Sequence, residues 1–424
     1  MRRPLVLALL VGAGCGSVND NPPDAPQALD AGPIDSPPPG TYTVRGTVTG
    51  FAGRNLVLKL NGGNDLPITA NGAFSFNAQL AEGATYAVTL SSAPVCPQRM
   101  CTLANNTGTI AGADATTLTV TCSAPHYRLV AQSWGDTSVR VTDDLAAIAN
   151  NGTAIPRIIK GASTMLTNSR LDSVAYDTSR DVIYAASHTS PTVIVFANGA
   201  TANGNIAPTR SISIAGETAL QGIEVDAAGD RLFVTSATRL YVLANASTLT
   251  GSITAPVAIP LASPASVSHD GINDRLFVAG DFTSTLYIFN SAATLTSSST
   301  PNKTVTWSGW NGPPAVAIDG CRDRLYLGSN TVSPGGFNMF AFDNASLLSG
   351  AIVPDSASQA RLQTGPVLSA DVDSAGVLWY WPDSAANVFA IDQPQTLAGV
   401  VTVTPDKTIN AVASSAYGLD VGAY

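Results

Sequence analysis

The sequence predicts an all-β protein that is mostly a six-bladed β-propeller, preceded by a small β-sandwich. Three observations predict this fold. A unit of short apolar strands and tight turns recurs five times after residue 126, and two fragments at the ends of that region complete a sixth copy. Before the repeats, a separate group of alternating strands is divided by Gly, Asn and Pro turns.

Composition narrows the range of partners. Only 12% of the 424 residues are charged, and 21 Lys and Arg stand against 30 Asp and Glu, which gives a net charge of −9. An acidic chain with scattered basic residues lacks the positive surface that binds a phosphate backbone, so we expect no nucleic-acid partner. After residue 15, no apolar run approaches the roughly 20 residues that a membrane-spanning helix needs.

Residues 1–15 read MRRPLVLALLVGAGC, with two arginines, an apolar stretch and small residues that end in Cys15. This order is typical of an export signal. The segment resembles a bacterial lipoprotein signal peptide, which implies that Cys15 is lipidated and becomes the mature N-terminus. Gly12 stands where that family usually has Leu, so ordinary cleavage to a soluble periplasmic or secreted protein is the alternative. Gly16, in place of Asp, favours the outer membrane or the cell surface.

Residues 16–40 are dominated by Pro, Asp and Ala and offer almost nothing to bury. We expect them to form a disordered tether. At about 3.1 Å per residue in polyproline geometry, such a tether spans tens of ångströms.

Residues 41–124 change to short alternating strands, which predict the β-sandwich. The Asn71-Gly72 pair between two such runs predicts a hairpin, since both residues tolerate positive φ. The pattern from VRGTVTGF to LTVTC resembles an immunoglobulin-like repeat module of secreted bacterial proteins with no known activity. The resemblance implies a disulfide between Cys101 and Cys122, which suits the oxidising conditions that an exported chain meets. Cys96 and Cys321 either bridge the two domains or remain free.

Residues 126–424 form the periodic region. Each repeat has an apolar strand, an aspartate, a turn and a second apolar strand, and the signature of this second part is Asp-Arg-Leu-Phe/Tyr-Val. The first aspartates are Asp177, Asp226, Asp270, Asp319 and Asp373, at spacings of 49, 44, 49 and 54 residues. This period matches a four-stranded propeller blade, so the region contains five complete blades.

The ends of the periodic region supply the sixth blade. Residues 126–133 (HYRLVAQS) align with a second strand, and residues 417–424 (YGLDVGAY) align with the missing first strand. Joining them closes the ring and removes both open edges. The repeat resembles the NHL and YncE-like propellers, which implies the fold but no particular activity, since such propellers include enzymes and binding modules.

Several residues are candidates for chemistry. The recurring Asp-x-x-x-Asp, as in Asp226 and Asp230, is compatible with calcium, but its place between two strands favours turn capping. His269 takes a position that is apolar in other blades, which favours a packed core histidine over a catalytic one. Glu224 is the acidic residue that stands out on an inner strand, and one carboxylate does not make a metal site. We therefore predict no catalytic residue, metal ligand or cofactor.

Geometry suggests a binding surface instead. In propellers, the loops that join second to third strands and those that join blades gather on one face around the channel mouth. Aromatic and acidic side chains exposed there suit a sugar or a peptide. The predicted ligand rim consists of Trp134, Asp136, His188, Asp281, Phe282, Trp310, Trp381 and Asp383. The alternative is that some of these residues pack between blades, as expected for Trp307 and Trp379.

These features favour a monomeric, non-enzymatic surface lipoprotein. Its propeller would bind an unidentified protein or glycan, and its N-terminal lipid would be its sole membrane contact. A second hypothesis is a secreted six-bladed hydrolase or lyase with a channel metal or histidine site, similar to the six-bladed lactonases. A third is a passive structural component of the cell envelope.

Overall fold

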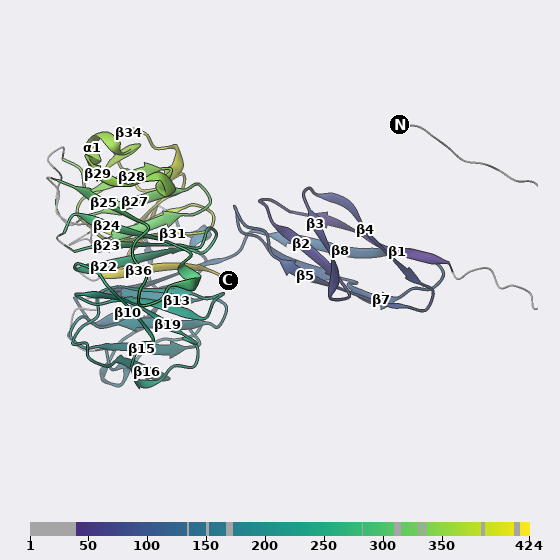
Figure 1. Ribbon diagram of the computed structural model, residues 1–424, viewed down its shortest axis with the longest axis horizontal. Coiled ribbons are helices and arrows are strands. Elements are labelled where there is room, and N and C mark those ends of the chain that lie inside the picture. The colour runs from purple at the N-terminus through teal and green to yellow at the C-terminus, as the bar shows by residue number, and fades with distance from the viewer. Residues whose placement is uncertain are drawn as a thin grey trace, which may run out of the picture.

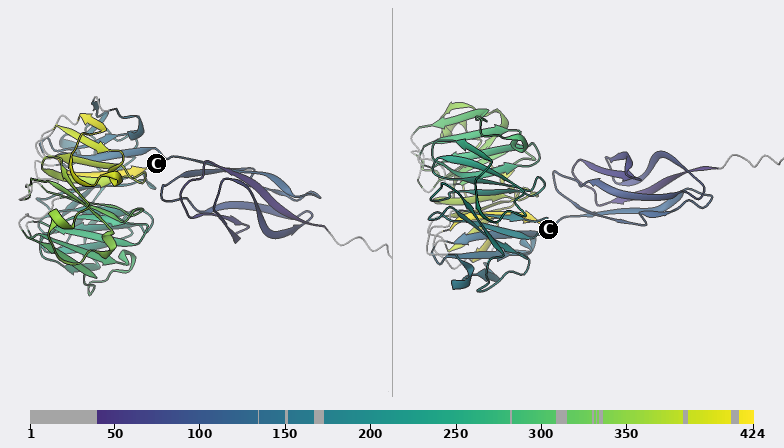
Figure 2. Two further views of the ribbon diagram at one scale, coloured as in Figure 1. Left: turned by 90° about the horizontal axis from the view of Figure 1, so that it is seen from above. Right: turned by 60° about the horizontal axis from the view of Figure 1, so that its bottom comes forward.

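The computed structural model consists of a β-sandwich and a β-propeller, joined by residues 124–126 (Figure 1). The propeller is a disc, and the sandwich projects from one of its flat faces (Figures 1 and 2). The structure describes residues 40–133, 135–149, 152–166, 173–281, 283–308, 315–329, 331, 333, 336–382, 386–410 and 416–424.

Two four-stranded sheets form the sandwich. One has the order β4 (Gly72–Ala81), β1 (Thr41–Thr49), β8 (Ala115–Ser123) and β6 (Met100–Ala104); the other has the order β3 (Gly63–Ile68), β2 (Leu56–Leu60), β5 (Thr85–Ser92) and β7 (Thr107–Thr109). Alternate side chains point inward, as the buried Val44 and Val48 of β1 illustrate. The expected disulfide between Cys101 and Cys122 is present, and it joins directly opposed residues of β6 and β8.

The hairpin predicted at Asn71-Gly72 is wrong. β3 and β4, which flank this pair, lie in different sheets. The Asn71 side chain explains the difference, because its amide oxygen accepts from the Phe51 nitrogen and its amide nitrogen donates to the Phe51 carbonyl, each at 2.8 Å. The pair therefore forms a turn that crosses between the sheets.

Five complete blades follow the chain, each with its first strand nearest the propeller axis. Blade 1 contains β13 (Ser173–Asp177), β14 (Val182–Ala186), β15 (Thr192–Ala197) and β16 (Arg210–Ile214); blade 2 contains β17 (Ile223–Asp226), β18 (Arg231–Thr235), β19 (Arg239–Ala244) and β21 (Val257–Pro260). Blade 3 contains β22 (Pro264–Asp270), β23 (Arg275–Gly280), β24 (Thr285–Asn290) and β25 (Lys303–Trp307); blade 4 contains β26 (Ala315–Asp319), β27 (Arg324–Gly328), β28 (Met339–Asp343) and β30 (Ala360–Gln363). Blade 5 contains β31 (Val367–Val372), β32 (Leu378–Pro382), β33 (Asn387–Ile391) and β35 (Lys407–Asn410).

The sixth blade, which we call the closing blade, joins the two ends of the propeller. Its order is β36 (Ala416–Ala423), β9 (Tyr127–Ser133), β10 (Ser138–Thr142) and β12 (Arg157–Ile159). The inner strands β36, β13, β17, β22, β26 and β31 contact one another in this order, and β31 contacts β36. The predicted six-bladed ring, closed by the C-terminal strand, is confirmed.

In four blades, a short strand from the following blade extends the sheet outward, a feature that the repeats did not predict. These strands are β20 (Gly251–Ile253), β29 (Gly350–Ile352), β34 (Gly399–Thr402) and β11 (Thr153–Ala154), which pair in parallel with β16, β25, β30 and β35. At the closing blade, the corresponding contact is a single parallel β-bridge between Ile159 and Gly204 of blade 1. These strands cover blade edges and link neighbouring blades.

Helical segments are short and lie in connections. They are η1 (Leu145–Ala147), η2 (Ala162–Thr164), η3 (Ala292–Thr294), η4 (Ala345–Leu347), η5 (Pro394–Thr396) and α1 (Pro354–Ala357). Apolar side chains fill the spaces between neighbouring blades, and Trp379 and Trp381 of blade 5 pack with Tyr127 and Leu129 of the closing blade. Each of the buried apolar clusters of the propeller combines side chains of two neighbouring blades, so hydrophobic burial holds the blades together.

Strand direction sorts the connections onto two faces. Because consecutive strands in a blade are antiparallel, the turns from first to second strands share one face with those from third to fourth strands. We call this the anchored face, since the sandwich adjoins it through residues 124–126. Loops from second to third strands and those between blades lie on the opposite side, which we call the loop face.

Deletion of residues 417–424 should open the ring and unfold the propeller, because it removes the strand that pairs with β9 and contacts β13 and β31. Calorimetry should then show loss of the propeller transition, with the sandwich transition retained as the internal control. A propeller that melts cooperatively at its original temperature would contradict this role for β36.

Candidate functional site

The predicted ligand rim is only partly within the described structure. Trp134, Phe282, Trp310 and Asp383 lie outside the described residues. Trp381 corrects the prediction, because its side chain is fully buried between blade 5 and the closing blade. A tryptophan on the second strand of a blade fills the space to the next blade, so Trp381 offers no surface to a ligand.

Asp136, His188 and Asp281 lie on the loop face, in the second-to-third-strand loops of three different blades. Asp136 is engaged within its own blade by Arg140, at 2.6 Å, and by Lys160, at 3.4 Å. No described pocket brings these three residues together.

Asp281 borders a pocket on the loop face. This hollow of about 260 Å³ lies between blades 2 and 3 and is lined by Gln221, Ala237, Ser263, Pro264 and Asp281. The Asp281 nitrogen donates to the Ser263 carbonyl at 2.8 Å, which fixes the loop at the rim of the hollow. An amide, a hydroxyl and a carboxylate thus surround a space that is open to solvent, and such groups bind ligand hydroxyls.

Three carboxylates gather around the propeller axis. Glu224 of β17 and Asp371 of β31 border a channel of about 30 Å³, and Asp420 of β36 lies beside Asp371. Burial raises the pKa of all three groups, and the negative charge of Asp420 raises the pKa of Asp371 and Glu224 further. The pKa of Asp420 rises to about 6. A channel of this size has room for about two water molecules.

Two of these carboxylates join neighbouring blades. Asp371 accepts from the Val421 nitrogen on β36 at 2.8 Å, and Asp420 accepts from the Tyr176 nitrogen on β13 at 2.5 Å. The closing strand is therefore held to blade 5 on one side and to blade 1 on the other. This arrangement gives Asp371 and Asp420 a structural role in closing the ring.

Sequence reasoning singled out Glu224 and missed Asp371 and Asp420, although the signal was present. All three occupy one position of the repeat, as the alignment of IEVD, ADVD and LDVG shows. Three of six blades therefore carry an acid at this position. The repeat register, rather than residue type alone, would have found the cluster.

The recurring Asp-x-x-x-Asp has the predicted turn-capping role. The first aspartate of each turn accepts backbone N–H groups of its own turn, from Ser179 and Arg180 to Asp177, Gly229 to Asp226, Ile272 and Asn273 to Asp270, Arg322 to Asp319, and Ala375 and Val377 to Asp373. The second aspartate has positive φ and accepts from the next connection on the same face, as Asp230 does from Ser247 at 2.8 Å. These oxygens are already used within the fold.

Arginines complete these turns. Arg275 contacts Asp270 of its own blade at 2.5 Å and Asp323 of the next blade at 2.7 Å. His269, above the same turn, packs against the Phe233 ring at a centroid distance of 5.2 Å, and burial lowers its pKa. His269 is therefore a packed, neutral histidine. Among the described residues, no three His, Cys, Asp or Glu side chains are placed to share a metal ion.

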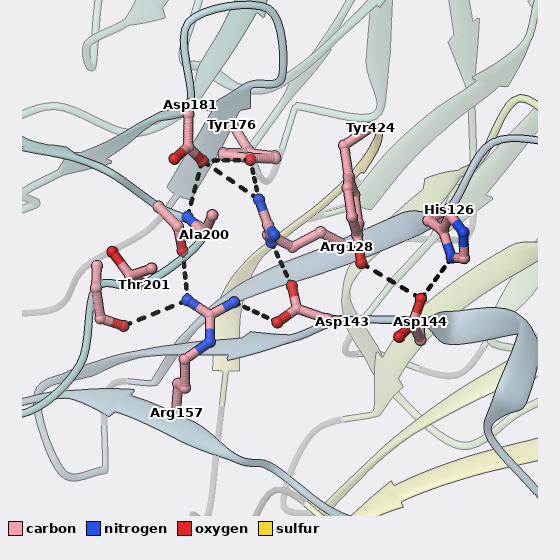
Figure 3. A network of polar contacts seen from close by, with 12 residues as sticks. His126, Arg128, Asp143, Asp144, Arg157, Tyr176, Asp181, Ala200, Thr201 and Tyr424 are labelled. Atoms are coloured by element: carbon pink, nitrogen blue, oxygen red, sulfur yellow. Dashed lines mark hydrogen bonds and ion pairs between the residues drawn. The ribbon is translucent and has the colours of Figure 1, made fainter. Parts of the chain in front are cut away.

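A polar network connects the closing blade to blade 1 on the anchored face (Figure 3). Asp143 binds both Arg128 and Arg157, the latter at 2.6 Å. Arg128 continues to Tyr176 and Asp181 of blade 1. Both arginines are largely buried, so this network stabilises the seam where the two ends of the propeller meet.

The sandwich is attached close to this seam. His126 and Tyr424 exchange two backbone hydrogen bonds, of 3.1 and 2.8 Å, which fix residues 124–126 to the closing strand. Burial raises the pKa of Tyr127 to about 12, whereas the nearby Arg99 of the sandwich opposes this rise. A second disulfide joins Cys96 of the sandwich to Cys321 of blade 4, with Cα atoms 5.2 Å apart. The bridge between domains, left open by the sequence, is present.

Comparisons with known proteins add little to this picture. No family model matches the sequence, and no curated protein matches it. Among solved structures, the chain is similar to a chain of the "Crystal structure of Nidogen/Laminin Complex", with 13% identity and a TM-score of 0.45. That match covers 70% of this chain and 98% of the other. The chain is a β-propeller protein, and its immunoglobulin-like kinship stays a prediction. No helix in the described ranges is long and apolar enough to cross a membrane.

Asp270→Ala should destabilise the propeller by about 3 kcal/mol, because it leaves the buried Arg275 with one partner fewer and removes a turn cap. Denaturant unfolding measures this, with the exposed Asp65→Asn as control. A chelator should leave the wild-type melting temperature unchanged. A large drop on chelation would instead assign the turns to calcium.

The propeller should lose stability as the pH rises. The folded-state pKa values of Asp371, Asp420 and Glu224 lie above their unfolded values, so the stability that each contributes is fully present below its unfolded pKa and is lost as the pH rises; for Asp420 this loss extends through about pH 6. Asp420→Asn should flatten this dependence in melting curves from pH 4 to 8. Asp114→Asn, in the sandwich, should leave the propeller profile unchanged. An equally steep profile in Asp420→Asn would refute the assignment.

Proposed function

We propose that this chain is an exported binding protein in which the sandwich is a stalk and the loop face of the propeller binds a glycan. The observation that carries the proposal is the attachment of the sandwich to one propeller face only. Residues 124–126 and the disulfide of Cys96 and Cys321 both lie at the anchored face, which leaves the loop face free of the sandwich.

The direction of the stalk supports this proposal. Strand β1 begins at the end of the sandwich that is remote from the propeller, as Figures 1 and 2 show. A lipid on Cys15 would therefore approach the sandwich from that end. The loop face would then point away from the membrane, toward partners outside the cell. Two disulfides are consistent with an extracytoplasmic location.

A glycan is favoured over a protein partner by the pocket chemistry. Gln221, Ser263 and Asp281 provide an amide, a hydroxyl and a carboxylate around a hollow of about 260 Å³. Sugar hydroxyls pair well with such groups, whereas a protein interface usually centres on buried apolar anchors. The central channel, at about 30 Å³, has room for water only, so we place the glycan in the loop-face hollow rather than in the channel.

Asp281→Asn and Gln221→Ala should each weaken glycan binding about tenfold, because each removes a polar contact from a site shielded by its neighbours. A glycan array with the full chain measures this, and Asp65→Asn on the sandwich is the matched surface control. If array binding is absent, or is unchanged in both variants, the glycan site is wrong. If a pull-down with the wild-type chain instead captures a protein that both variants fail to capture, the loop face binds a protein partner.

The anchor is tested separately by mass spectrometry of the mature N-terminus in its native host. A diacyl or triacyl mass on Cys15 is expected. An unmodified N-terminus near this position would indicate a soluble exported protein, without affecting the glycan test.

A further inference from the structure

We propose that the disulfide between Cys96 and Cys321 is a reducible latch that fixes the sandwich on the propeller and releases it on thiol exchange. The two cysteines are 225 residues apart and belong to different domains. The disulfide between Cys101 and Cys122 lies within the sandwich instead. The latch does not depend on the identity of any ligand on the loop face.

The domains have two covalent connections at the anchored face. The first is the peptide linker of residues 124–126, whose propeller end is fixed by the hydrogen bonds of His126 with Tyr424. A single short linker leaves the sandwich free to rotate about it. The second connection, through Cys96 in the loop between β5 and β6, removes that freedom. Opening the disulfide therefore changes domain orientation, not domain structure.

Both ends of the latch are held independently of the bond itself. Asp319 accepts from the Arg322 nitrogen at 3.1 Å and its guanidinium at 2.7 Å, which fixes the turn that carries Cys321. On the sandwich side, Arg54 and Val95 exchange backbone hydrogen bonds of 2.8 and 2.9 Å beside Cys96. Each loop is thus expected to keep its shape after reduction.

The surroundings of the latch favour attack at Cys321. A hollow of about 150 Å³ borders Cys321 on the anchored face, between blades 3, 4 and 5. Cys96 and Cys321 are both partly exposed, whereas in the other disulfide only Cys101 is partly exposed and Cys122 is buried. Accessible disulfides exchange faster than buried ones, so the latch should open first.

Arg54 makes Cys96 the better leaving group. Its Nη2 lies 3.7 Å from the Cys96 Sγ. A nearby cation stabilises a thiolate and lowers its pKa, and a thiol of lower pKa leaves faster. The hollow favours attack on the Cys321 sulfur and Arg54 favours departure of the Cys96 sulfur, so the two features favour the same reaction.

The reaction needs a dithiol reductant. One of its thiolates attacks the Cys321 Sγ, forms a mixed disulfide and breaks the bond to Cys96, which leaves as a thiolate. The second thiol of the reductant, as its thiolate, then attacks the reductant's sulfur in that mixed disulfide and releases Cys321 as a thiolate. Each released thiolate then takes a proton from solvent when the pH lies below the pKa of its thiol. Two electrons pass to the protein, and the dithiol becomes a cyclic disulfide.

Graded dithiothreitol on the full folded chain tests the order of opening. Alkylation and peptide mass mapping should find Cys96 and Cys321 labelled at a reductant concentration about tenfold lower than Cys101 and Cys122. Small-angle X-ray scattering at that concentration should show a broader distribution of interdomain distances. Near-ultraviolet circular dichroism should show that both domains remain folded.

Arg54→Gln tests the leaving group. Opening of the latch should slow about threefold in this variant, since the Cys96 thiolate loses its cation. Arg45→Gln is the matched control, because Arg45 is an exposed sandwich arginine that pairs with Asp114. Equal labelling of all four cysteines, or scattering unchanged by reduction, would overturn the latch. Equal rates in the two arginine variants would overturn the role of Arg54.

Discussion

The backbone ladder between β36 and β9 is the interaction on which the propeller depends. It pairs residues 416–423 with residues 127–133 and so joins the two ends of a chain segment about 300 residues long. Side chains reinforce it on both sides, through Asp371 toward blade 5 and Asp420 toward blade 1. Each blade packs only on its neighbours, so a ring without this ladder would expose two apolar blade faces and two strand edges.

The turns of the anchored face show how repetition can imitate a ligand site. A carboxylate pair that recurs at a fixed interval resembles a set of metal ligands when it is read along the chain. In the fold, the first aspartate of each pair accepts N–H groups of its own turn, and the second ties that turn to another. Arg275 then extends one such turn to the next blade. The pattern recurs because the turn recurs, and the oxygens that a metal would need already have donors.

The sequence allowed the blade count to be predicted because the repeat is local. The period, the turn residues and the two half-repeats are each visible in short stretches of sequence. Residues 417–424 match the first strand of a repeat, and the incomplete repeat at residues 126–133 was the one that lacked this strand. Contacts between blades were less accessible. The strands β11, β20, β29 and β34 are two to four residues long, and each pairs in parallel with the outer strand of a neighbouring blade. No alternation or turn signal marks a strand of that length.

The candidate site was harder to predict for two different reasons. Trp381 was placed on a ligand rim because an exposed aromatic ring near a loop can stack on a sugar. Burial of so large a side chain between blades releases more free energy than leaving it exposed for a ligand, and Trp381 is buried. Asp371 and Asp420 were missed because residue types were compared without the repeat register. The pairing of Cys96 with Cys321 was undecidable from spacing, since a bond across 225 residues depends on how two domains meet.

Ring closure and attachment of the sandwich are parts of one structure. Tyr424 directly follows the closing strand, pairs with His126 of the linker and lies under the Arg128 guanidinium at 4.3 Å. Arg128 in turn belongs to the network with Asp143 that joins the closing blade to blade 1 (Figure 3). A force on the sandwich is therefore transmitted directly to the seam of the ring. The disulfide at Cys321 enters the ring at blade 4, so the sandwich is tied covalently to the propeller at two places, blade 4 and the closing blade.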